Sequence, residues 1–218
     1  MYKYTNFILK PKSKLITIIN TKTGNFLSVV NMLKKIGYKS ILTDDINIIT
    51  NSKIIIFPGV GNFDTVMSNV YEKKIDKAIC AAIAKGSKIL GICVGMQALF
   101  NESSEGTLKG LGIINGKIKK FVNNDINFKV PHMGWNNVRF INHSKFNINL
   151  NKNRFYFVHS YFAECENKED VLGETHYLIN FVSAVKKKNV YGVQFHPEKS
   201  HFYGKKFLET FINDESSC

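Results

Sequence analysis

The chain has 218 residues, of which 30 are lysine or arginine and 17 are aspartate or glutamate, giving a formal net charge of +13. A chain of this length can bury a sizeable core without disulfides or metal ions, and no apolar run approaches the ~18 residues of a membrane-spanning helix. The positive charge is almost all lysine and is spread along the sequence. This pattern indicates a solvated surface, which could help to dock an acidic partner, rather than the clustered basic face of a nucleic-acid-binding protein.

The cysteines and the first residues indicate the compartment. The four cysteines lack the spacings of a zinc site, so we expect neither a metal ion nor a cofactor. Residues 1–14 lack the apolar segment of a signal peptide, and a reducing cytoplasm suits such a chain, without a membrane or nucleic acid as partner. We expect a mobile extension over residues 1–13, one domain over residues 14–213 and a mobile tail over residues 214–218.

Strands and helices alternate along the first half of the sequence. Short apolar runs predict strands over residues 15–19, 39–42, 53–57 and 88–92. Helical spacing of apolar residues predicts one helix that starts within residues 23–29 and ends at Gly37, and another that contains residues 70–83 and ends near Gly86.

The second half indicates mainly β-structure. Residues 101–124 are glycine-rich and predict a loop with one strand over residues 117–121. Residues 130–195 contain short β-branched and aromatic strands, with a hairpin turn at the lysine run 186–188, and a last amphipathic helix spans residues 202–212. The alternation predicts an α/β fold with a mostly parallel central sheet and helices on both faces.

Cys93 stands at the most informative position in the chain. It ends the predicted strand over residues 88–92 and opens a helix-like run over residues 94–100. Gly91 and Gly95 flank it, as in a nucleophile elbow, where small residues permit close backbone approach and leave the nucleophile exposed above the sheet edge. A helix N-terminus also favours a thiolate. A lone cysteine is more often a buried structural residue, so a second signal is needed.

That second signal is a histidine and a carboxylate two residues apart, His196 and Glu198, at the end of a strand-like run over residues 190–195. Residues i and i+2 of an extended segment point the same way. Glu198 could therefore fix one tautomer of His196 while the other ring nitrogen faces the thiol of Cys93. The three residues together predict a catalytic triad.

Residues 91–97 (Gly-Ile-Cys-Val-Gly-Met-Gln) and 194–198 (Gln-Phe-His-Pro-Glu) resemble the two signatures of class I glutamine amidotransferases, whose architecture is flavodoxin-like. The resemblance implies that Cys93 attacks the side-chain amide of L-glutamine, that His196 acts first as a base and then as an acid, and that Glu198 orients it. Ammonia would then leave, and water would hydrolyse a glutamyl thioester.

Other segments narrow the resemblance. Residues 57–63 (Phe-Pro-Gly-Val-Gly-Asn-Phe) follow a strand, and closely spaced glycines there could leave N–H groups free to meet a developing negative charge. Residues 131–136 contain the only tryptophan, and residues 156–161 form an aromatic run. These pieces occur in the same order in the glutaminase subunits of imidazole glycerol phosphate synthase (HisH type), which the chain resembles from about residue 14 to its end.

This closer resemblance implies a glutamine pocket. An oxyanion strand and the residue after the nucleophile would stabilise the oxyanion, and a His-Ser-Tyr stretch would contact the α-amino and carboxylate end of the substrate. The residues implied are Gly59, Val60, Gly61, Val94, Gln97, Ser160 and Tyr161.

The resemblance also implies a partner. Ammonia would pass to a (β/α)8-barrel synthase subunit that makes imidazole glycerol phosphate and aminoimidazole carboxamide ribotide. Asn25, Trp135 and Lys199 are the implied interface residues, and the peptide near Val60 would switch activity on when the partner binds its ligand. Many members of this family have an acidic and an aromatic residue at the positions of Asn20 and Thr21. This difference does not involve any residue of the predicted triad.

Three alternatives stay open at this point. A Cys-His-Glu hydrolase of the peptidase or deglycase type shares the elbow, but would not need Gln97, the Pro-Gly-Val-Gly segment or the Pro-His-Met-Gly-Trp-Asn segment. A catalytically silent interaction module would not depend on Cys93. A paralogous glutaminase could supply ammonia to another barrel partner, for example in amidino-sugar synthesis.

Overall fold

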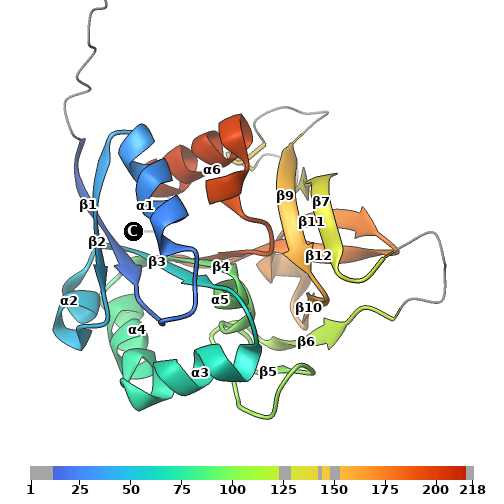
Figure 1. Ribbon diagram of the computed structural model, residues 1–218, viewed down its shortest axis with the longest axis horizontal. Coiled ribbons are helices and arrows are strands. Elements are labelled where there is room, and N and C mark those ends of the chain that lie inside the picture. The colour runs from blue at the N-terminus through green and yellow to red at the C-terminus, as the bar shows by residue number, and fades with distance from the viewer. Residues whose placement is uncertain (1–11, 123–128, 142–143, 148–152, 215–218) are drawn as a thin grey trace, which may run out of the picture.

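The computed structural model describes residues 12–122, 129–141, 144–147 and 153–214. Figure 1 shows a central sheet with helices on both of its faces. The parallel half of this sheet has the strand order β2-β1-β3-β4-β13. Its strands are β1 (Lys12–Ile19), β2 (Tyr38–Thr43), β3 (Ile54–Gly59), β4 (Lys88–Cys93) and β13 (Val190–Val193).

Two groups of helices cover this half of the sheet (Figure 1). One face carries α1 (Phe26–Lys35) and α6 (His201–Asn213), and the other carries α2 (Ile46–Asn51), α3 (Phe63–Glu72) and α4 (Ile75–Ala84). The strands β3 and β4 lie between the two layers, and nearly all of their residues are buried. Their continuous apolar sequences are those expected of parallel strands covered on both faces.

The other half of the sheet is mainly antiparallel. It continues from β13 through β12 (Ile179–Lys187), β10 (Tyr161–Cys165) and β6 (Gly116–Lys120) to β5 (Glu102–Ser103), and β11 (Val171–Tyr177) joins β12 to β8 (Arg139–Phe140). A separate ribbon pairs β7 (His132–Asn137) with β9 (Arg154–His159). Short 3₁₀ turns, η1 (Lys168–Asp170) and η2 (Pro197–Lys199), precede β11 and α6.

The predicted α/β class is confirmed, as are the strand before Cys93 and the last amphipathic helix. The lysine run does form a hairpin turn, in which Lys188 has a φ of +53° between β12 and β13.

The structure differs from the sequence-based expectations in four places. The single helix expected over residues 70–83 is divided into α3 and α4, because Lys74 adopts a left-handed conformation (φ +57°). No glycine or proline stands at this position to indicate the break in the sequence. The helix α2 was missed, although Asp45 caps it by accepting hydrogen bonds from the N–H groups of Asn47 and Ile48. The aromatic run 156–161 is interrupted at Ser160, between β9 and β10.

The fourth difference concerns the domain boundaries. The strand β1 begins at Lys12, two residues before the expected start of the domain, and residues 1–11 lie outside the described part of the chain. At the other end, Asp214 does not belong to a mobile tail. Its carboxylate is buried, accepts a hydrogen bond from Tyr191 Oη at 2.9 Å and pairs with Lys145 Nζ at 2.9 Å, which fixes the end of α6 to the sheet.

The strand β4 passes into the short helix α5 (Val94–Gln97) through a sharp turn at Cys93. Two glycines make this turn possible. A Cβ atom on Gly95 would overlap the carbonyl oxygen of Phe57 in β3, and a Cβ on Gly91 would lie 2.6 Å from the carbonyl oxygen of Gly95. The elbow therefore requires backbone-to-backbone contact between α5 and the two central strands.

We predict that Gly95→Ala lowers the free energy of unfolding by roughly 1–3 kcal/mol, the usual cost of overpacking a core, and also changes the alkylation rate of the Cys93 thiol. Urea unfolding and mass spectrometry of the Cys93 peptide measure the two effects. The control is Gly37→Ala, where a positive φ of +85° is strained for alanine but no atom lies within 4 Å of the added Cβ. It should lose about 1 kcal/mol of stability without altering Cys93. Equal alkylation of Cys93 in wild type and Gly95→Ala would contradict the role of this contact.

Candidate active site

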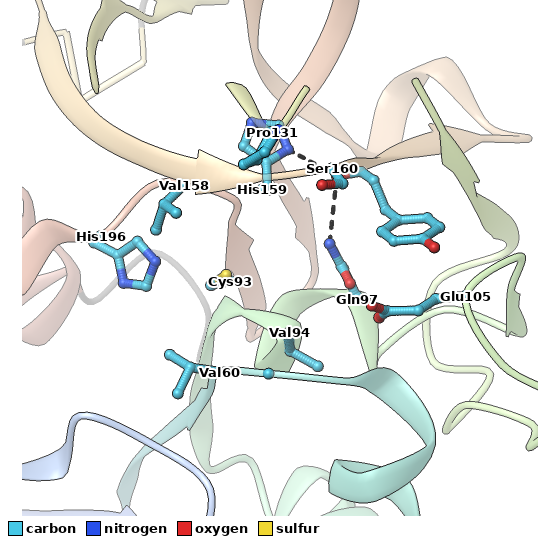
Figure 2. Close-up of a pocket in the computed structure, with 12 residues that line it drawn as sticks. Val60, Cys93, Val94, Gln97, Glu105, Pro131, Val158, His159, Ser160 and His196 are labelled. Atoms are coloured by element: carbon cyan, nitrogen blue, oxygen red, sulfur yellow. Dashed lines mark hydrogen bonds between the residues drawn. The ribbon is translucent and has the colours of Figure 1, made fainter. Parts of the chain in front are cut away.

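A pocket of about 290 Å³ opens at the carboxyl ends of β3 and β4, where open α/β sheets commonly bind ligands. Its volume lies near the lower end of the range for ligand pockets, ~300–1,000 Å³, so it suits one small molecule. Twelve described residues line it (Figure 2): Val60, Gly61, Cys93, Val94, Gln97, Glu105, Pro131, Val158, His159, Ser160, Tyr161 and His196.

Cys93 lies at the floor of the pocket with a strained backbone. Its φ is +55° and its ψ is −114°, a conformation that L-residues rarely adopt. The residue is 5% exposed, and its sulfur faces the cavity (Figure 2). The strained turn thus directs the thiol into the pocket, while the peptide N–H of Val94 starts the next helix beside it.

His196 lies beside Cys93 and is backed by Glu198. Its Nδ1 atom is 2.7 Å from Glu198 Oε1, and the side chains of both residues are at most 3% exposed. Its Nε2 atom is buried without a hydrogen-bond partner among the described residues, and the ring turns this edge toward the sulfur of Cys93 (Figure 2). Burial, the largest single effect, lowers the pKa of His196, but Cys93 and Glu198 together outweigh it and raise this pKa above its ordinary value.

Ser200, a residue that sequence reasoning missed, holds the histidine loop against β9. Its hydroxyl donates to the carbonyl oxygen of His196 at 2.6 Å and accepts from the N–H of Tyr156 at 3.0 Å. The N–H of His196 in turn donates to the carbonyl oxygen of Tyr156 at 2.9 Å. Because Ser200 is fully buried, these bonds fix the backbone that carries the imidazole.

The segment predicted to be an oxyanion strand ends at the pocket. Gly59 pairs in register with Cys93 and contacts Gly95 rather than the cavity, whereas Val60 and Gly61 line it. We expected the N–H groups of this strand to be free, but that of Val60 donates to the carbonyl oxygen of Thr23 at 3.5 Å. In this conformation, then, the Val60 N–H is directed toward the β1–α1 loop and not toward a bound oxyanion.

The far end of the pocket is polar. Ser160 and Tyr161 come from the junction of β9 and β10, and Gln97 from the end of α5. The Nε2 atom of Gln97 donates to the Gln194 Oε1 atom at 3.0 Å. It also donates to the Tyr161 carbonyl oxygen at 3.4 Å, the bond that Figure 2 draws as a dashed line. Both of its N–H groups are thereby used, and its Oε1 atom is buried without a partner among the described residues.

Glu105 is a second residue that sequence reasoning missed. It is the one acidic side chain among the described residues that line the pocket, and it lies at the end away from His196 (Figure 2). Its Oε2 atom accepts from the N–H of Phe63 at 2.9 Å. Asp64 holds the adjoining loop by accepting from the N–H groups of Thr107 and Leu108. Desolvation raises the pKa of Glu105, against a lowering by the Phe63 N–H.

Glu105 was missed because it lies in a glycine-bordered loop without periodicity. The signal that could have indicated it is chemical: a zwitterionic amino acid needs an anion for its ammonium group. The loop after the elbow helix, residues 101–124, contains two glutamates, of which Glu102 is exposed and Glu105 half-buried.

The three expected interface residues lie outside the pocket lining. Trp135 is 40% exposed and meets the ring of Tyr156 edge-on at 6.2 Å, while the Nζ atom of Lys199 lies 5.7 Å from the same tyrosine ring. Trp135 also stacks on His201, with centroids 5.6 Å apart. Asn25 is exposed at the start of α1, a helix that contacts η2. These elements thus bring the tryptophan and the lysine together on one tyrosine.

Within the described residues, no helix is long and apolar enough to cross a membrane. Nor do three or more histidine, cysteine, aspartate or glutamate side chains of that part of the chain meet in a way that could hold a metal ion.

Comparison with known proteins identifies the family of this chain. The family model described as glutamine amidotransferase class-I matches residues 17–214. Imidazole glycerol phosphate synthase subunit HisH 2 of Methanococcus maripaludis is 49% identical over 91% of this chain and 98% of its own length. Subunit HisH of the same synthase from Leptospira interrogans is 42% identical over 91% of this chain and 100% of its own length.

Solved structures share the fold at lower identity. The structure of PurLQS from Thermotoga maritima superposes with a TM-score of 0.71 at 19% identity, over 94% of this chain and 99% of that chain. A crystal structure of a glutamine amidotransferase gives a TM-score of 0.69 at 17% identity, over 90% and 96%. With the fold, the elbow and these relatives taken together, the chain belongs to the class I glutamine amidotransferases and, among them, to the HisH family.

Proposed function

We propose that this chain is the glutaminase subunit of imidazole glycerol phosphate synthase in histidine biosynthesis, and that it hydrolyses L-glutamine to glutamate and ammonia through Cys93, His196 and Glu198. The observation that carries the proposal is the convergence of three features at one pocket. The thiol of Cys93 is held in the cavity by the elbow, the unpartnered Nε2 of His196 faces it, and Glu198 binds the opposite ring nitrogen.

The first half of the reaction follows from these positions. The Nε2 atom of neutral His196 takes the proton of the Cys93 thiol, and the thiolate attacks the side-chain amide carbon of glutamine. Backbone N–H groups at Val94 and in the oxyanion strand stabilise the oxyanion, each worth roughly 2.7–4 kcal/mol of barrier. His196 then returns its proton to the departing nitrogen, and ammonia leaves a glutamyl thioester on Cys93.

The second half repeats the proton transfers with water. His196 takes a proton from water while the oxygen attacks the thioester carbon. The carbon–sulfur bond breaks, the electron pair stays on the sulfur of Cys93, and glutamate leaves. Glu198 stabilises the imidazolium, because its Oε1 atom accepts the Nδ1–H bond.

The polar end of the pocket accommodates the amino-acid part of the substrate. We propose that the carboxylate of Glu105 pairs with the α-ammonium group and that the buried Oε1 of Gln97 accepts a second bond from it. The Ser160–Tyr161 segment contacts the α-carboxylate. The separation of Glu105 from His196 across the cavity (Figure 2) supports this orientation, with the side-chain amide directed toward Cys93.

The ammonia is delivered to a partner. We propose a (β/α)8-barrel synthase subunit, which uses ammonia to form imidazole glycerol phosphate and aminoimidazole carboxamide ribotide. The cluster of exposed Trp135 and half-buried Lys199 around Tyr156, together with Asn25, is the proposed contact surface, since aromatic side chains are enriched at protein interfaces.

We predict that Cys93→Ala abolishes glutamine hydrolysis in the complex with the synthase subunit, because no other group can form the thioester. Release of glutamate measures this activity. The same complex should still form imidazole glycerol phosphate when an ammonium salt replaces glutamine, since the partner's chemistry is left intact. The control variant is Cys80→Ala, which removes an exposed cysteine of α4 and should keep full activity.

Two outcomes would contradict the proposed function. Glutamate release by Cys93→Ala at the wild-type rate would exclude a cysteine nucleophile. Cleavage of peptides by the wild-type chain, with glutamine left untouched, would favour a hydrolase of the peptidase type.

The position of the Val60 N–H generates a second prediction. We propose that the Gly59–Val60 peptide must turn for this N–H to reach the oxyanion. Its present bond to Thr23 is long, at 3.5 Å, and therefore weak, so a bound partner could shift it. The isolated chain should hydrolyse glutamine at least tenfold more slowly than the complex with a ligand in the synthase subunit, a factor that equals about 1.4 kcal/mol. A rate that is equal in both, measured as glutamate release, would contradict the switch.

A third prediction concerns the ammonium site. We expect Glu105→Gln to raise the KM for glutamine roughly tenfold or more, the loss typical of a charged hydrogen bond, with a smaller change in kcat. Steady-state glutaminase assays measure both constants. Glu102→Gln, an exposed neighbour on the same loop, is the matched control. The difference between Glu105→Gln and wild type should vanish with 4-carbamoylbutanoate, which lacks the α-amino group. An equal loss with both substrates would show that Glu105 does not bind the ammonium.

A further inference from the structure

Gln194 contacts the nucleophile, although the mechanism above gives it no part. It directly follows β13 and is fully buried, and its Nε2 atom donates to the sulfur of Cys93 at 3.6 Å. Its own N–H donates to the carbonyl oxygen of Ser183 at 2.9 Å, which fixes its backbone to β12. A donor held against the reacting sulfur has a direct chemical consequence, because it stabilises the thiolate relative to the thiol.

The orientation of the Gln194 amide is determined by its neighbour. The Oε1 atom of Gln194 accepts from Gln97 Nε2 at 3.0 Å. Gln97 Nε2 also donates to the carbonyl oxygen of Tyr161 at 3.4 Å. A carbonyl oxygen can only accept, so Gln97 must present its NH₂ group to Tyr161 and to Gln194. Gln194 must then present its oxygen to Gln97 and its NH₂ group to Cys93.

The carbonyl oxygen of Tyr161 also determines which ring nitrogens carry a proton in a buried pair of histidines, His159 and His132. His159 Nδ1 lies 2.7 Å from the Tyr161 carbonyl oxygen, so this nitrogen carries the proton and Nε2 of a neutral ring accepts. The Nε2 atom lies 2.9 Å from His132 Nδ1, which must therefore be the donor. His132 Nε2 is left as an acceptor, and Asn136 Nδ2 lies 3.3 Å from it. Every donor along this line of contacts meets an acceptor.

The pair is also held neutral and rigid. Burial lowers the pKa of His132 to about 4 and that of His159 to about 3. The ring of His132 lies between Phe157 and Tyr177, with centroids 4.8 Å and 4.0 Å away. A proton added to His159 would place two N–H groups against each other at the contact between the rings, and one added to Nε2 of His132 would face the NH₂ group of Asn136. The arrangement is thus stable only in the tautomers that the Tyr161 carbonyl requires.

We propose that Gln194 is a catalytic residue that stabilises the thiolate of Cys93, and that His132 and His159 are positioning residues that hold it through the Tyr161 carbonyl and Gln97. The proposal rests on the proposed function for its chemistry. When water has attacked the thioester and the carbon–sulfur bond breaks, the electron pair remains on sulfur. The amide N–H of Gln194 is then in position to donate a hydrogen bond to the thiolate. The same donor favours the thiolate before the attack on glutamine.

The first experiment replaces the donor. Gln194→Met has a similar length and volume but no N–H. Alkylation of Cys93 by iodoacetamide, followed by mass spectrometry of its peptide, reports the thiolate fraction as a function of pH. We expect the alkylation profile of Cys93 in this variant to lie at higher pH than in wild type, with an alkylation rate about tenfold lower at a given pH on the rising limb. In the complex, kcat should fall about tenfold or more, with KM for glutamine changed less than threefold.

The second experiment acts at a distance from the sulfur. In His132→Asn the side-chain amide places an N–H near the position of the Nδ1–H, whereas His132→Leu has nearly the same volume and no donor. The alkylation profile should shift toward higher pH in His132→Leu, by about threefold in proton affinity, and should return toward wild type in His132→Asn. In the double variant with Gln194→Met, the leucine should add no further shift, because residues that act through one contact are not additive.

The alkylation profile does not require glutamine hydrolysis, so the two proposals fail separately. A wild-type complex without glutaminase activity would overturn the proposed function. An active wild type whose Gln194→Met variant keeps the wild-type alkylation profile and kcat would overturn only the role of Gln194. Equal profiles for His132→Asn and His132→Leu, in variants whose thermal unfolding is matched, would overturn the positioning role. If Gln194→Met does not fold, the comparison of His132→Asn with His132→Leu still tests whether this line of contacts stabilises the thiolate of Cys93.

Discussion

The site depends on one strained backbone turn, the positive φ of Cys93 at the end of β4. Such a conformation costs of order 1–3 kcal/mol and persists only where its surroundings impose it. Here the surroundings are the two central strands. Gly95 rests directly on the backbone of β3, and Gly91 on that of Gly95, so α5 has no room to relax the turn. The packing of the sheet core therefore fixes the position of the thiol in the pocket.

The electrostatics of the pocket follow from the burial of its reactive side chains. A thiol and an imidazole beside each other at the end of the sheet are nearly removed from water, as is the carboxylate behind them. In that environment each hydrogen bond to a charged group is stronger than in water. Glu198 steadies His196 from one side, and the Gln194 amide contacts Cys93 from another. The polar groups around the sulfur thus have fixed orientations before any substrate enters.

Much of the fold and the residues of the proposed triad could be predicted from the sequence. The apolar runs before Cys93 and His196 have the length of buried strands, and small residues around Cys93 indicate an elbow. What sequence could not provide is orientation. The Val60 N–H is directed to Thr23 because of a peptide rotation that no residue type encodes. The break at Lys74 is a left-handed lysine where no glycine stands. Glu105 and Ser200 act through contacts formed only when distant segments pack together.

The central claim is that the sulfur of Cys93 forms a covalent bond to the substrate. Acid quenching of the working complex with the synthase subunit, followed by mass spectrometry of the intact chain and its peptides, tests it directly. We expect a glutamyl adduct on the peptide that contains Cys93, formed during turnover and lost when glutamine is exhausted. Steady release of glutamate with no adduct on that peptide, or with the adduct on another residue, would contradict it.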